Sequence, residues 1–281
     1  MPSPRNKPAP REPRRGPRQA KAQPFDKPPI SVFPSTLWTY PSQHYGDTEH
    51  GDKNYAGATP SWVIWQLLSR YTREGDRVVD PMCGSGATIG VANELQRAPR
   101  GFDLNPTRGD IERADARRLP LPNAWADFVF IDPPYSTHID YSDEPGCIGK
   151  LDASEPDQRG VIGGAYYDAM RQTIEEARRI LKDRRYLGLY VSDSFKKRKP
   201  NADRPAFCPV GFELFAILRE SFTPIDIIAV VRGNEKLARG NWRKTAIEEN
   251  FFLRGFNYCF IMKKEDARKP PKAGRPRKPG G

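Results

Sequence analysis

The sequence predicts an α/β fold in which one domain is built on a mostly parallel sheet. Short apolar segments that read as strands alternate with longer segments whose apolar residues recur at helical spacing. Three of the strand-like segments end at or next to an acidic residue, namely Asp80, Asp103 and Asp132. Ligands of open α/β sheets bind at the carboxyl ends of the strands, so these acids mark the expected functional edge.

The expected elements follow in an order that suits such a fold. Only a short link separates the second strand from the third, so no full helix fits between them. In chain order the sequence predicts a helix over 62–71, a strand over 77–80, a helix over 87–95, strands over 100–104, 110–116 and 127–131, a helix over 166–182, a strand over 186–192, a helix over 212–220, and strands over 225–231 and 257–263. The last two strands are expected to form an antiparallel hairpin.

Three irregular segments interrupt this order. Residues 33–55 are rich in aromatic and turn residues, and they form either a flap over a ligand or a loop fixed to the sheet by its aromatic rings. The long loop 136–164 begins at 136–142, which we expect to be a wall of the substrate pocket. An insertion over 233–255 mixes basic residues with a tryptophan.

The stretch Asp132-Pro133-Pro134-Tyr135 directly follows the apolar run 127–131. Neither proline can donate a hydrogen bond to a neighbouring strand, so the strand must stop at Asp132. A carboxylate is thereby held at a strand tip, with an aromatic ring three residues further on. A plain strand-ending turn needs only an Asp-Pro pair, whereas a doubled proline with an aromatic residue favours a functional site.

A glycine-containing turn precedes this stretch by about fifty residues. The segment Asp80-Pro81-Met82-Cys83-Gly84-Ser85-Gly86 links the strand over 77–80 to the helix over 87–95. Gly84 and Gly86 allow the backbone to pass close to a ligand at the helix N-terminus. A lone glycine turn is often only a tight connection between a strand and a helix. The functional interpretation of this turn therefore depends on its position before the Asp132 motif.

The net charge of +11 lies in the two ends of the chain. Residues 1–29 hold eight Lys or Arg against two acids, and residues 263–281 hold the same, which leaves a body with a net charge of about −1. Nine of the first 29 residues are proline. We therefore expect a disordered basic tail over 1–29, a folded domain over 30–264, and a second basic tail over 265–281. Either tail is a solubilising segment or a nucleic-acid-binding arm.

Cysteine and histidine usage argues against a metal centre or a disulfide framework. The four cysteines, Cys83, Cys147, Cys208 and Cys259, are scattered without metal-ligand spacing, and the three histidines are dispersed. A reducing compartment is therefore expected. No apolar stretch resembles a signal peptide or reaches the length of a membrane span, so the expected location is the cytoplasm.

Together, in this order and spacing, the two motifs resemble the amino-methyltransferases that act on DNA with S-adenosylmethionine (SAM). The resemblance covers roughly Thr59 to Lys264, in the branch in which the glycine motif comes first. It implies a class I methyltransferase fold (Rossmann-like), SAM as cofactor and an exocyclic base amine as methyl acceptor. An initial Asp in the proline motif is commoner among N6-adenine enzymes and an initial Ser among N4-cytosine enzymes, so Asp132 favours adenine.

The resemblance also implies roles for individual residues. Asp103 is placed to bind the ribose hydroxyls of SAM, and Asp115 corresponds to the residue that accepts a hydrogen bond from the adenine amine, although a solvated loop aspartate is the alternative for it. The expected SAM-binding residues are Thr59, Asp80, Met82, Cys83, Gly84, Ser85, Gly86, Thr88, Asp103, Leu104, Asp115 and Ala116.

The expected catalytic residues are those of the proline motif, Asp132, Pro133, Pro134 and Tyr135. An exocyclic amine is a poor nucleophile because its lone pair is delocalised into the ring. The Asp132 carboxylate and the Pro133 carbonyl can each accept one amine hydrogen and fix the nitrogen in line with the methyl group. Tyr135 can stack on a base that has been flipped out of the duplex.

Basic residues and one tryptophan, in three separate segments, are the candidate nucleic-acid contacts. They are Lys196, Lys197 and Arg198 after a strand, Arg239, Trp242 and Arg243 in the insertion, and Arg275 and Arg277 around a Gly-Arg-Pro core similar to that of an AT-hook.

Three other functions remain open. One is an N4-cytosine DNA methyltransferase, and the second is a guanine-N2 methyltransferase of tRNA or ribosomal RNA, whose glycine motif the segment 80–86 also resembles. The third is a DNA-binding protein that kept the fold without its activity. Guanine-N2 enzymes usually carry a separate RNA-binding domain before the glycine motif, and only about 58 residues precede Thr59. The sequence therefore favours DNA, and the oligomeric state stays open.

Overall fold

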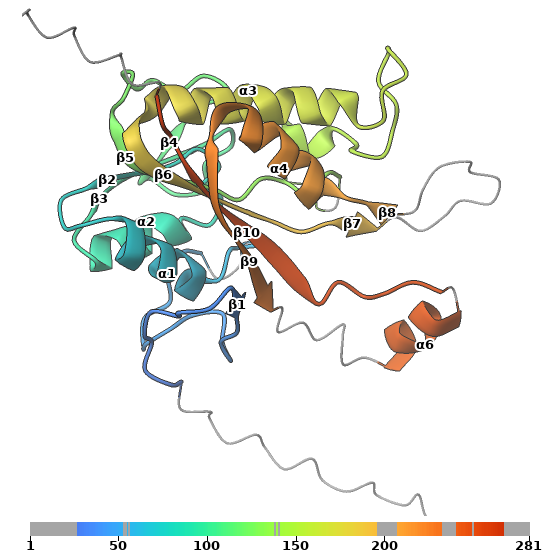
Figure 1. The fold of residues 1–281 in the computed structure, drawn as a ribbon, viewed down its shortest axis with the longest axis horizontal. Helices are drawn as coiled ribbons and strands as arrows, with labels where there is room; N and C mark the ends of the chain where they lie inside the picture. The colour runs from blue at the N-terminus through green and yellow to red at the C-terminus, as the bar shows by residue number, and fades with distance from the viewer. Residues whose placement is uncertain are drawn as a thin grey trace, which may run out of the picture.

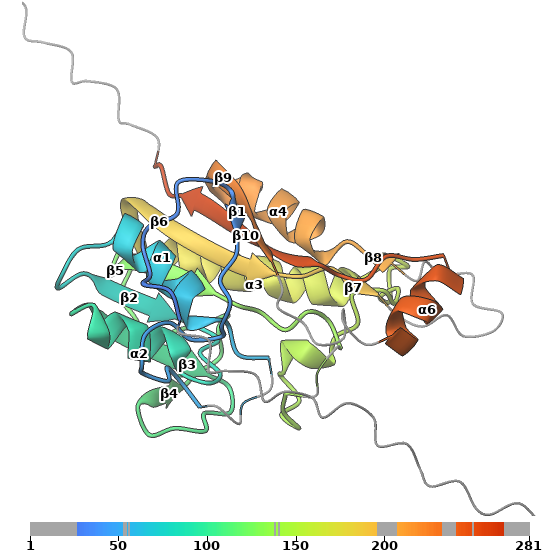
Figure 2. The same cartoon turned by 90° about the horizontal axis from the view of Figure 1, so that it is seen from below.

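A central sheet with helices on both faces forms the protein (Figures 1 and 2). The computed structural model describes residues 27–52, 55, 57–137, 139, 141–195, 207–231, 240–248 and 250–266. Among these residues the sheet has eight strands in the order β1-β9-β10-β6-β5-β2-β3-β4, and β7 and β8 form a separate two-stranded hairpin.

The strands are β1 (Leu37–Trp38), β2 (Arg77–Asp80), β3 (Ala98–Asp103), β4 (Ile111–Arg113), β5 (Ala126–Ile131), β6 (Leu181–Val191), β7 (Ser194–Phe195), β8 (Phe207–Cys208), β9 (Thr223–Val231) and β10 (Phe256–Lys263). The helices are α1 (Ser61–Tyr71), α2 (Ala87–Glu94), a short 3-10 helix (Ile148–Lys150), α3 (Gly164–Ile180), α4 (Val210–Ser221) and α6 (Gly240–Glu248).

Strand direction identifies the fold. All neighbours in the central sheet pair in parallel except β10, which runs antiparallel to both β6 and β9. Without the additional edge strand β1, the strands lie in the order third, second, first, fourth, fifth, seventh, sixth along the chain. This is the class I methyltransferase fold, so the predicted fold class and the predicted late antiparallel hairpin are confirmed.

The core has two layers, one on each face of the sheet. β5 lies at the centre and is buried along its whole length. Phe128 and Phe130 of β5 pack on the side of α1, whereas Val129 and Ile131 pack on the side of α3. Burial on both faces explains why this strand reads as an unbroken apolar run rather than an alternating one.

The segment 33–55, for which two interpretations were open, is fixed by its aromatic rings in its first half. Trp38 is buried, and Phe33 contacts both Trp38 and Trp62 edge to face. The second half reaches the glycine turn, where the Asp52 backbone N–H donates to the Ser85 carbonyl at 2.8 Å. The role of this second half as a flap over a ligand stays a prediction.

Several described elements differ from the sequence-based expectation. β1 lies within the segment expected to be irregular, β7 and β8 form a hairpin that was not predicted, and α6 occupies part of the insertion 233–255. β6 also begins five residues early, at Leu181, directly after α3. β1 and the β7–β8 hairpin are defined by their pairing, because two residues are too few to show a periodic pattern.

No helix among the described residues combines the length and the apolar composition needed to cross a membrane.

The close approach of β3 to the glycine turn gives a first prediction. A Cβ atom on Gly101 would lie 2.5 Å from Cys83 Sγ and 2.7 Å from Ile89 Cδ1. We expect Gly101→Val to overpack this contact and lower the free energy of unfolding by about 1–3 kcal/mol, measured by urea denaturation. Gly109→Ala is the control, because a Cβ atom there meets nothing within 4 Å. Equal stability of the two variants would contradict the expectation.

Candidate active site

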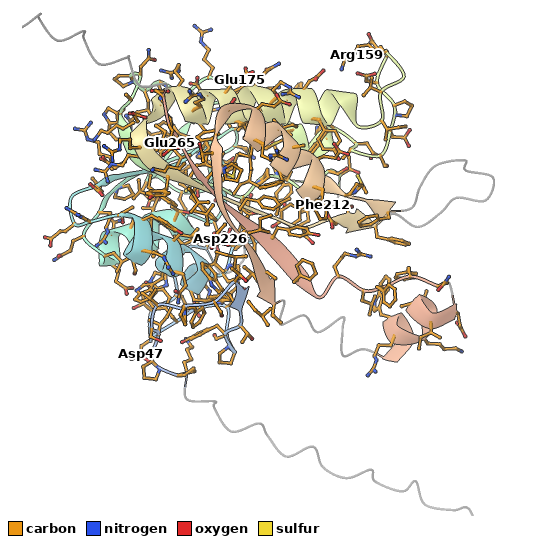
Figure 3. The ribbon with its side chains drawn as sticks, in the orientation of Figure 1. Asp47, Arg159, Glu175, Phe212, Asp226 and Glu265 are labelled. Atoms are coloured by element: carbon orange, nitrogen blue, oxygen red, sulfur yellow. The ribbon has the colours of Figure 1, made fainter. Side chains whose placement is uncertain are left out.

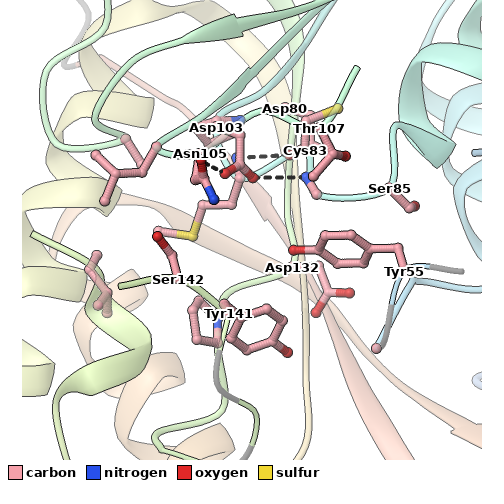
Figure 4. Close-up of a pocket in the computed structure, with 18 of the residues that line it drawn as sticks. Tyr55, Asp80, Cys83, Ser85, Asp103, Asn105, Thr107, Asp132, Tyr141 and Ser142 are labelled. Carbon is pink, nitrogen blue, oxygen red and sulfur yellow. Dashed lines mark hydrogen bonds between the residues drawn. The ribbon is translucent and has the colours of Figure 1, made fainter. Parts of the chain in front are cut away.

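One pocket lies at the carboxyl ends of β2, β3 and β5, and the three strand-end acids line it together (Figure 4). Asp80 comes from β2 and Asp103 from β3, while Asp132 follows the last residue of β5. The glycine turn between β2 and α2 forms another part of the wall. Asp132 and the Gly84 turn, which the sequence predicted to meet, therefore share one cavity.

The glycine turn needs glycine for two physical reasons. Gly84 and Gly86 have φ angles of +45° and +79°, in the left-handed region that side chains disfavour. A Cβ atom on Gly84 would come within 2.9 Å of the Tyr55 ring, and one on Gly86 within 2.6 Å of the Arg108 guanidinium group. Gly86 is the N-cap of α2, so the turn delivers backbone N–H groups to a helix N-terminus that favours negatively charged groups.

Asp103 supports the glycine turn from the neighbouring strand. Its Oδ2 atom accepts a hydrogen bond from the Gly84 backbone N–H at 3.0 Å, and its Oδ1 atom accepts one from the Asn105 backbone N–H at 2.9 Å. These contacts hold the carboxylate against the turn while it still lines the pocket (Figure 4).

Asp80 is the buried acid of the pocket, with 3% of its surface exposed. Its carboxyl group accepts hydrogen bonds from Thr88 Oγ1 at 2.6 Å and from the Met82 backbone N–H at 3.0 Å. Burial raises the pKa of Asp80 to about 7, because loss of water disfavours the charged form more than these two hydrogen bonds favour it. A positively charged ligand beside Asp80 would favour the ionised form.

Two hydroxyl groups hold the carboxylate of Asp132. Tyr135 donates to Oδ1 at 2.8 Å, and Thr59, which precedes α1, donates to Oδ2 in a short hydrogen bond. Asn257 of β10 then donates from Nδ2 to the Tyr135 hydroxyl at 3.5 Å. The Tyr135 ring itself packs against the core on the α3 side of the sheet. Three separate segments thus meet at this one acid.

Two tyrosines that the sequence analysis did not select flank Asp132 (Figure 4). Tyr55 and Tyr141 both line the pocket, with ring centroids 6.3 Å apart. Burial raises the pKa of each hydroxyl, and the nearby charge of Asp132 raises it further, so both stay protonated at neutral pH. Tyr141 lies in the segment 136–142 that was expected to form the wall, and Tyr55 is the last residue of the aromatic segment 33–55.

Asp115 lines the pocket, but its carboxylate already has a partner. Arg117 binds it through two nitrogens, at 2.9 Å and 2.6 Å, and the same guanidinium group donates to the Gly146 carbonyl at 3.0 Å. The Arg117 hydrogen bond lowers the pKa of Asp115. This pair therefore connects the strand-end region to the 141–148 wall of the pocket.

Most of the predicted site residues meet in this pocket. Those that line it are Thr59, Asp80, Met82, Cys83, Gly84, Ser85, Thr88, Asp103, Leu104, Asp115, Ala116, Asp132 and Pro134. Gly86, Pro133 and Tyr135 lie next to the pocket without forming its surface.

The predicted nucleic-acid contacts lie elsewhere or outside the described residues. Trp242 and Arg243 are exposed on α6 and do not line the pocket. The remaining six, Lys196, Lys197, Arg198, Arg239, Arg275 and Arg277, fall outside the part of the chain that the structure describes.

The residues of the pocket fit SAM. Four acidic residues line the cavity, as suits a ligand that carries positive charge, and the bend at Gly84 leaves no room for a Cβ atom. Fold and pocket together define the class: this is the architecture of the SAM-dependent class I methyltransferases, with SAM as its cofactor.

The family match is more specific than the fold. Residues 3–111 match the family model described as DNA methylase, for N6 and N4 methyltransferases. This match confirms the resemblance expected from the motifs. It includes the glycine turn and Asp103, and it stops before Asp132.

The chain is similar to proteins whose names indicate different substrates. A ribosomal protein L11 methyltransferase of Bacillus licheniformis is 24% identical over 165 residues, which are 58% of this chain and 46% of that protein. TrmN of Thermus thermophilus is 17% identical with a TM-score of 0.45, over 74% of this chain and 50% of that one. A putative DNA modification methylase, also of Thermus thermophilus, is 20% identical with a TM-score of 0.35, over 57% and 54% of the two chains. The chain spans half or less of the length of the first two.

The buried Asp80 predicts a pH-dependent stability. The folded protein keeps the Asp80 proton up to about pH 7, whereas the unfolded chain releases it near the ordinary value of 3.8. The free energy of unfolding therefore falls as pH rises from about 4 to 7. The amide side chain of the Asp80→Asn variant does not titrate, so this variant should not lose stability in the same way. We therefore expect the free energy of unfolding of Asp80→Asn, relative to that of the wild type, to rise by about 2–3 kcal/mol between pH 5 and pH 8. Urea denaturation at both pH values measures the difference, and an unchanged difference would refute the assignment.

Proposed function

We propose that this protein transfers a methyl group from SAM to an exocyclic amine of a DNA base, most favourably N6 of adenine. The observation that carries the proposal is the shared pocket of Asp132 and the Gly84 turn. The DNA methylase family match over residues 3–111 supports a DNA substrate. The same site could serve N4 of cytosine, and the initial Asp of the proline motif favours adenine.

The residues around the glycine turn would hold SAM. Asp103 is assigned the ribose hydroxyls, and the backbone of residues 83–85 together with Asp80 is assigned the methionine end. When bound, SAM supplies an electrophilic methyl group. Asp115 is assigned the adenine end on the strength of its position in the wall. Because Arg117 already binds its carboxylate, the hydrogen bond to the adenine amine requires an oxygen lone pair that Arg117 leaves open.

Asp132 and the Pro133 carbonyl would accept the two hydrogens of the base amine. Tyr166 donates to the Pro134 carbonyl at 2.7 Å, and the Ser136 backbone N–H donates to the same oxygen at 3.0 Å. These contacts fix the turn that carries Pro133. Two fixed acceptors would lower the activation free energy of methyl transfer, because the amine is already held in the reactive orientation.

Thr59 and Tyr135 would fix the direction of the Asp132 carboxylate. Each hydroxyl donates to a different oxygen of the carboxylate, so the two bonds together limit how the group can turn. The assigned stacking of Tyr135 on the base stays a prediction. Tyr141, which lines the pocket beside Asp132, is the additional ring that we assign to contact with the base.

The DNA-binding surface is assigned to segments that leave the sheet at the pocket edge. β6 and β9 are parallel to β5, and their carboxyl ends lead into the β7–β8 hairpin and α6. Both insertions therefore begin at the edge where Asp132 lies. Lys196, Lys197 and Arg198 between β7 and β8, and Arg239, Trp242 and Arg243 in the second insertion, are the assigned contacts to phosphate and base.

Substitution of Asp132 and of Asp103, each by alanine in a separate variant, distinguishes the proposed catalytic role from the proposed role in SAM binding. We expect Asp132→Ala to reduce methyl transfer at least about 1,000-fold with SAM affinity within about threefold of wild type, because Asp132 is assigned to the amine. Asp103→Ala is expected to weaken SAM binding by about 10–100-fold, since the ribose contacts and the support of Gly84 are lost together. Isothermal titration gives the affinity, and mass spectrometry of nucleosides from treated DNA gives the product.

The control for both variants is Asp226→Ala, an exposed acid on β9 outside the pocket. Near-normal turnover in Asp132→Ala would remove the catalytic assignment. Methylated nucleosides found in tRNA and not in duplex DNA would replace the DNA substrate with RNA.

The hydroxyl contacts to Asp132 make a separate prediction. We expect Tyr135→Phe to lower kcat by about 10–100-fold without raising the KM for SAM, because the acceptor loses one of the two bonds that orient it. Tyr186→Phe is the matched control for the loss of a tyrosine hydroxyl, because Tyr186 lies on the neighbouring strand β6 and does not line the pocket. An equal effect of the two substitutions on kcat would indicate general loosening of the region instead.

The basic C-terminal residues give a prediction about affinity. Deletion of 267–281 removes six basic residues and retains Asp266, which pairs with Arg178 at 2.8 Å. We expect weaker DNA binding and a smaller slope of log affinity against log salt concentration, because fewer counterions are released. Fluorescence anisotropy on duplex DNA at several salt concentrations measures both, and unchanged values would exclude the tail from DNA binding.

A further inference from the structure

An apolar area at one end of the sheet has no covering element among the described residues. On the side of the sheet that carries α3 and α4, α4 covers β10, as the contact between Phe215 and Phe260 shows. β9 and β1 lie beyond α4 on that side. Six large apolar residues here are between 39% and 63% exposed, and we name them the β9 face: Leu37, Phe212, Ile225, Ile227, Val231 and Phe256.

Strand register places the β9 face on one side of the sheet. Val231 lies opposite Phe256, and Ile227 lies opposite the α4-covered Phe260, so each pair points to the same side. Leu37 lies opposite Ala229, the residue midway between Ile227 and Val231. The intervening residues Ile228 and Val230 are buried against the α1 side. The exposed positions therefore form a contiguous row and are not scattered.

Two aromatic contacts extend this row onto the neighbouring elements. Phe212 projects from α4 over β10, with its ring centroid 5.6 Å from that of Tyr258 (Figure 3). Phe256 contacts the same Tyr258 ring at 5.1 Å. Ile225, at the β-bulge near the start of β9, marks the other end of the row. The β9 face thus runs from the first turn of α4 along the whole of β9.

The size of the β9 face matches the apolar part of a homodimer interface. With about 150–200 Å² for a large apolar side chain, these exposures sum to roughly 500 Å². A standard interface buries about 800 Å² per partner, and about 65% of that area is apolar in homodimers, which is also roughly 500 Å². A patch of about 500 Å² is within the range of the largest apolar patch on a typical protein surface, about 300–600 Å², and such patches are often functional.

The composition of the chain argues against an internal cover. The segments outside the described residues contain only three large apolar residues, Met1, Phe25 and Leu237. Nucleic acid is also a poor occupant, because the exposed Glu213 flanks Phe212 on α4. In addition, Arg254, which acts on the adjoining Tyr258, stacks its guanidinium group on the Phe207 ring. A twofold contact buries the same patch on both copies, and the area of the β9 face matches what such a contact needs.

The strand edge indicates how the contact forms. β1 pairs with β9 only at Ala229 and Val230, so the first half of β9 is an edge. Pro224 and Asp226 stand on that edge, and such residues prevent a further strand from adding. Contact through the face of the sheet, rather than through its edge, is therefore the mode that the residues allow.

We propose that the β9 face is the surface through which two copies of this chain form a twofold-symmetric dimer. Each copy places its β9 face on that of the other, and both active-site pockets stay outside the contact because none of the six residues lines the pocket. The inference does not depend on the proposed methyl transfer.

Sedimentation velocity of the full chain, over a concentration range from about 1 to about 100 µM, tests the proposal. We expect a dimer for the wild type. Ile227→Glu should raise the dissociation constant at least about 100-fold, since the residue enters a twofold contact from both copies. The control is Ile162→Glu, a residue of the same type and similar exposure in the 155–163 loop, which should leave the dimer intact. Phe212→Glu on α4 gives a second disruption from an element outside the sheet.

Two results would overturn the proposal. One is a wild-type chain that stays monomeric up to about 100 µM, and the other is a dimer that survives both Ile227→Glu and Phe212→Glu. Circular dichroism and SAM titration establish that each variant is folded, so that a monomeric variant reports loss of the contact. A wild type that is monomeric alone and pairs only with an added protein through the same residues would replace the second copy with that partner.

Discussion

Two hydroxyl groups that donate to one carboxylate tie the candidate site together. Asp132 stands at the end of β5, the strand that is buried on both faces, and it is bonded by Thr59 from before α1 and by Tyr135 from the following turn. The central strand fixes where the acid lies, and the hydroxyls fix how it is turned. The acid is thus held both in place and in direction, as the proposed catalysis by positioning requires.

The architecture could be predicted from the sequence because its main elements have strong local patterns. The run that became β5 and the amphipathic pattern of α3 each indicate their structure within one window of residues. β1 carries no such signal, because it has only two residues and exists through its bonds to β9, almost two hundred residues later. α6 is mostly polar, and the β7–β8 hairpin pairs two residues with two, so neither has a periodic pattern to detect.

The candidate site also has features that could be predicted from the sequence and features that could not. The acids at the strand tips and the glycine turn were predictable, because parallel strands bring their carboxyl ends to one edge. Asn257 was not, since 122 residues separate it from the Tyr135 hydroxyl that it contacts and only the antiparallel placement of β10 joins them. The pairing of Asp115 with Arg117 also escaped prediction, because two residues that are close together on a turn can point either toward or away from each other. The sequence therefore predicted where the backbone places these residues, but not which side chains they contact.

The position of Asn257 has a consequence for the chain during its synthesis. Contacts around Asp132 come from residue 59, residue 135 and residue 257, and β10 lies between β6 and β9 in the sheet. A ribosome must therefore deliver nearly the whole polypeptide before the middle of the sheet can close. Until β10 is made, the sheet lacks the strand that joins β6 to β9, and the Tyr135 hydroxyl lacks its contact with Asn257. The support of Asp132 is therefore completed late, although the residues that line the pocket all lie between 55 and 148.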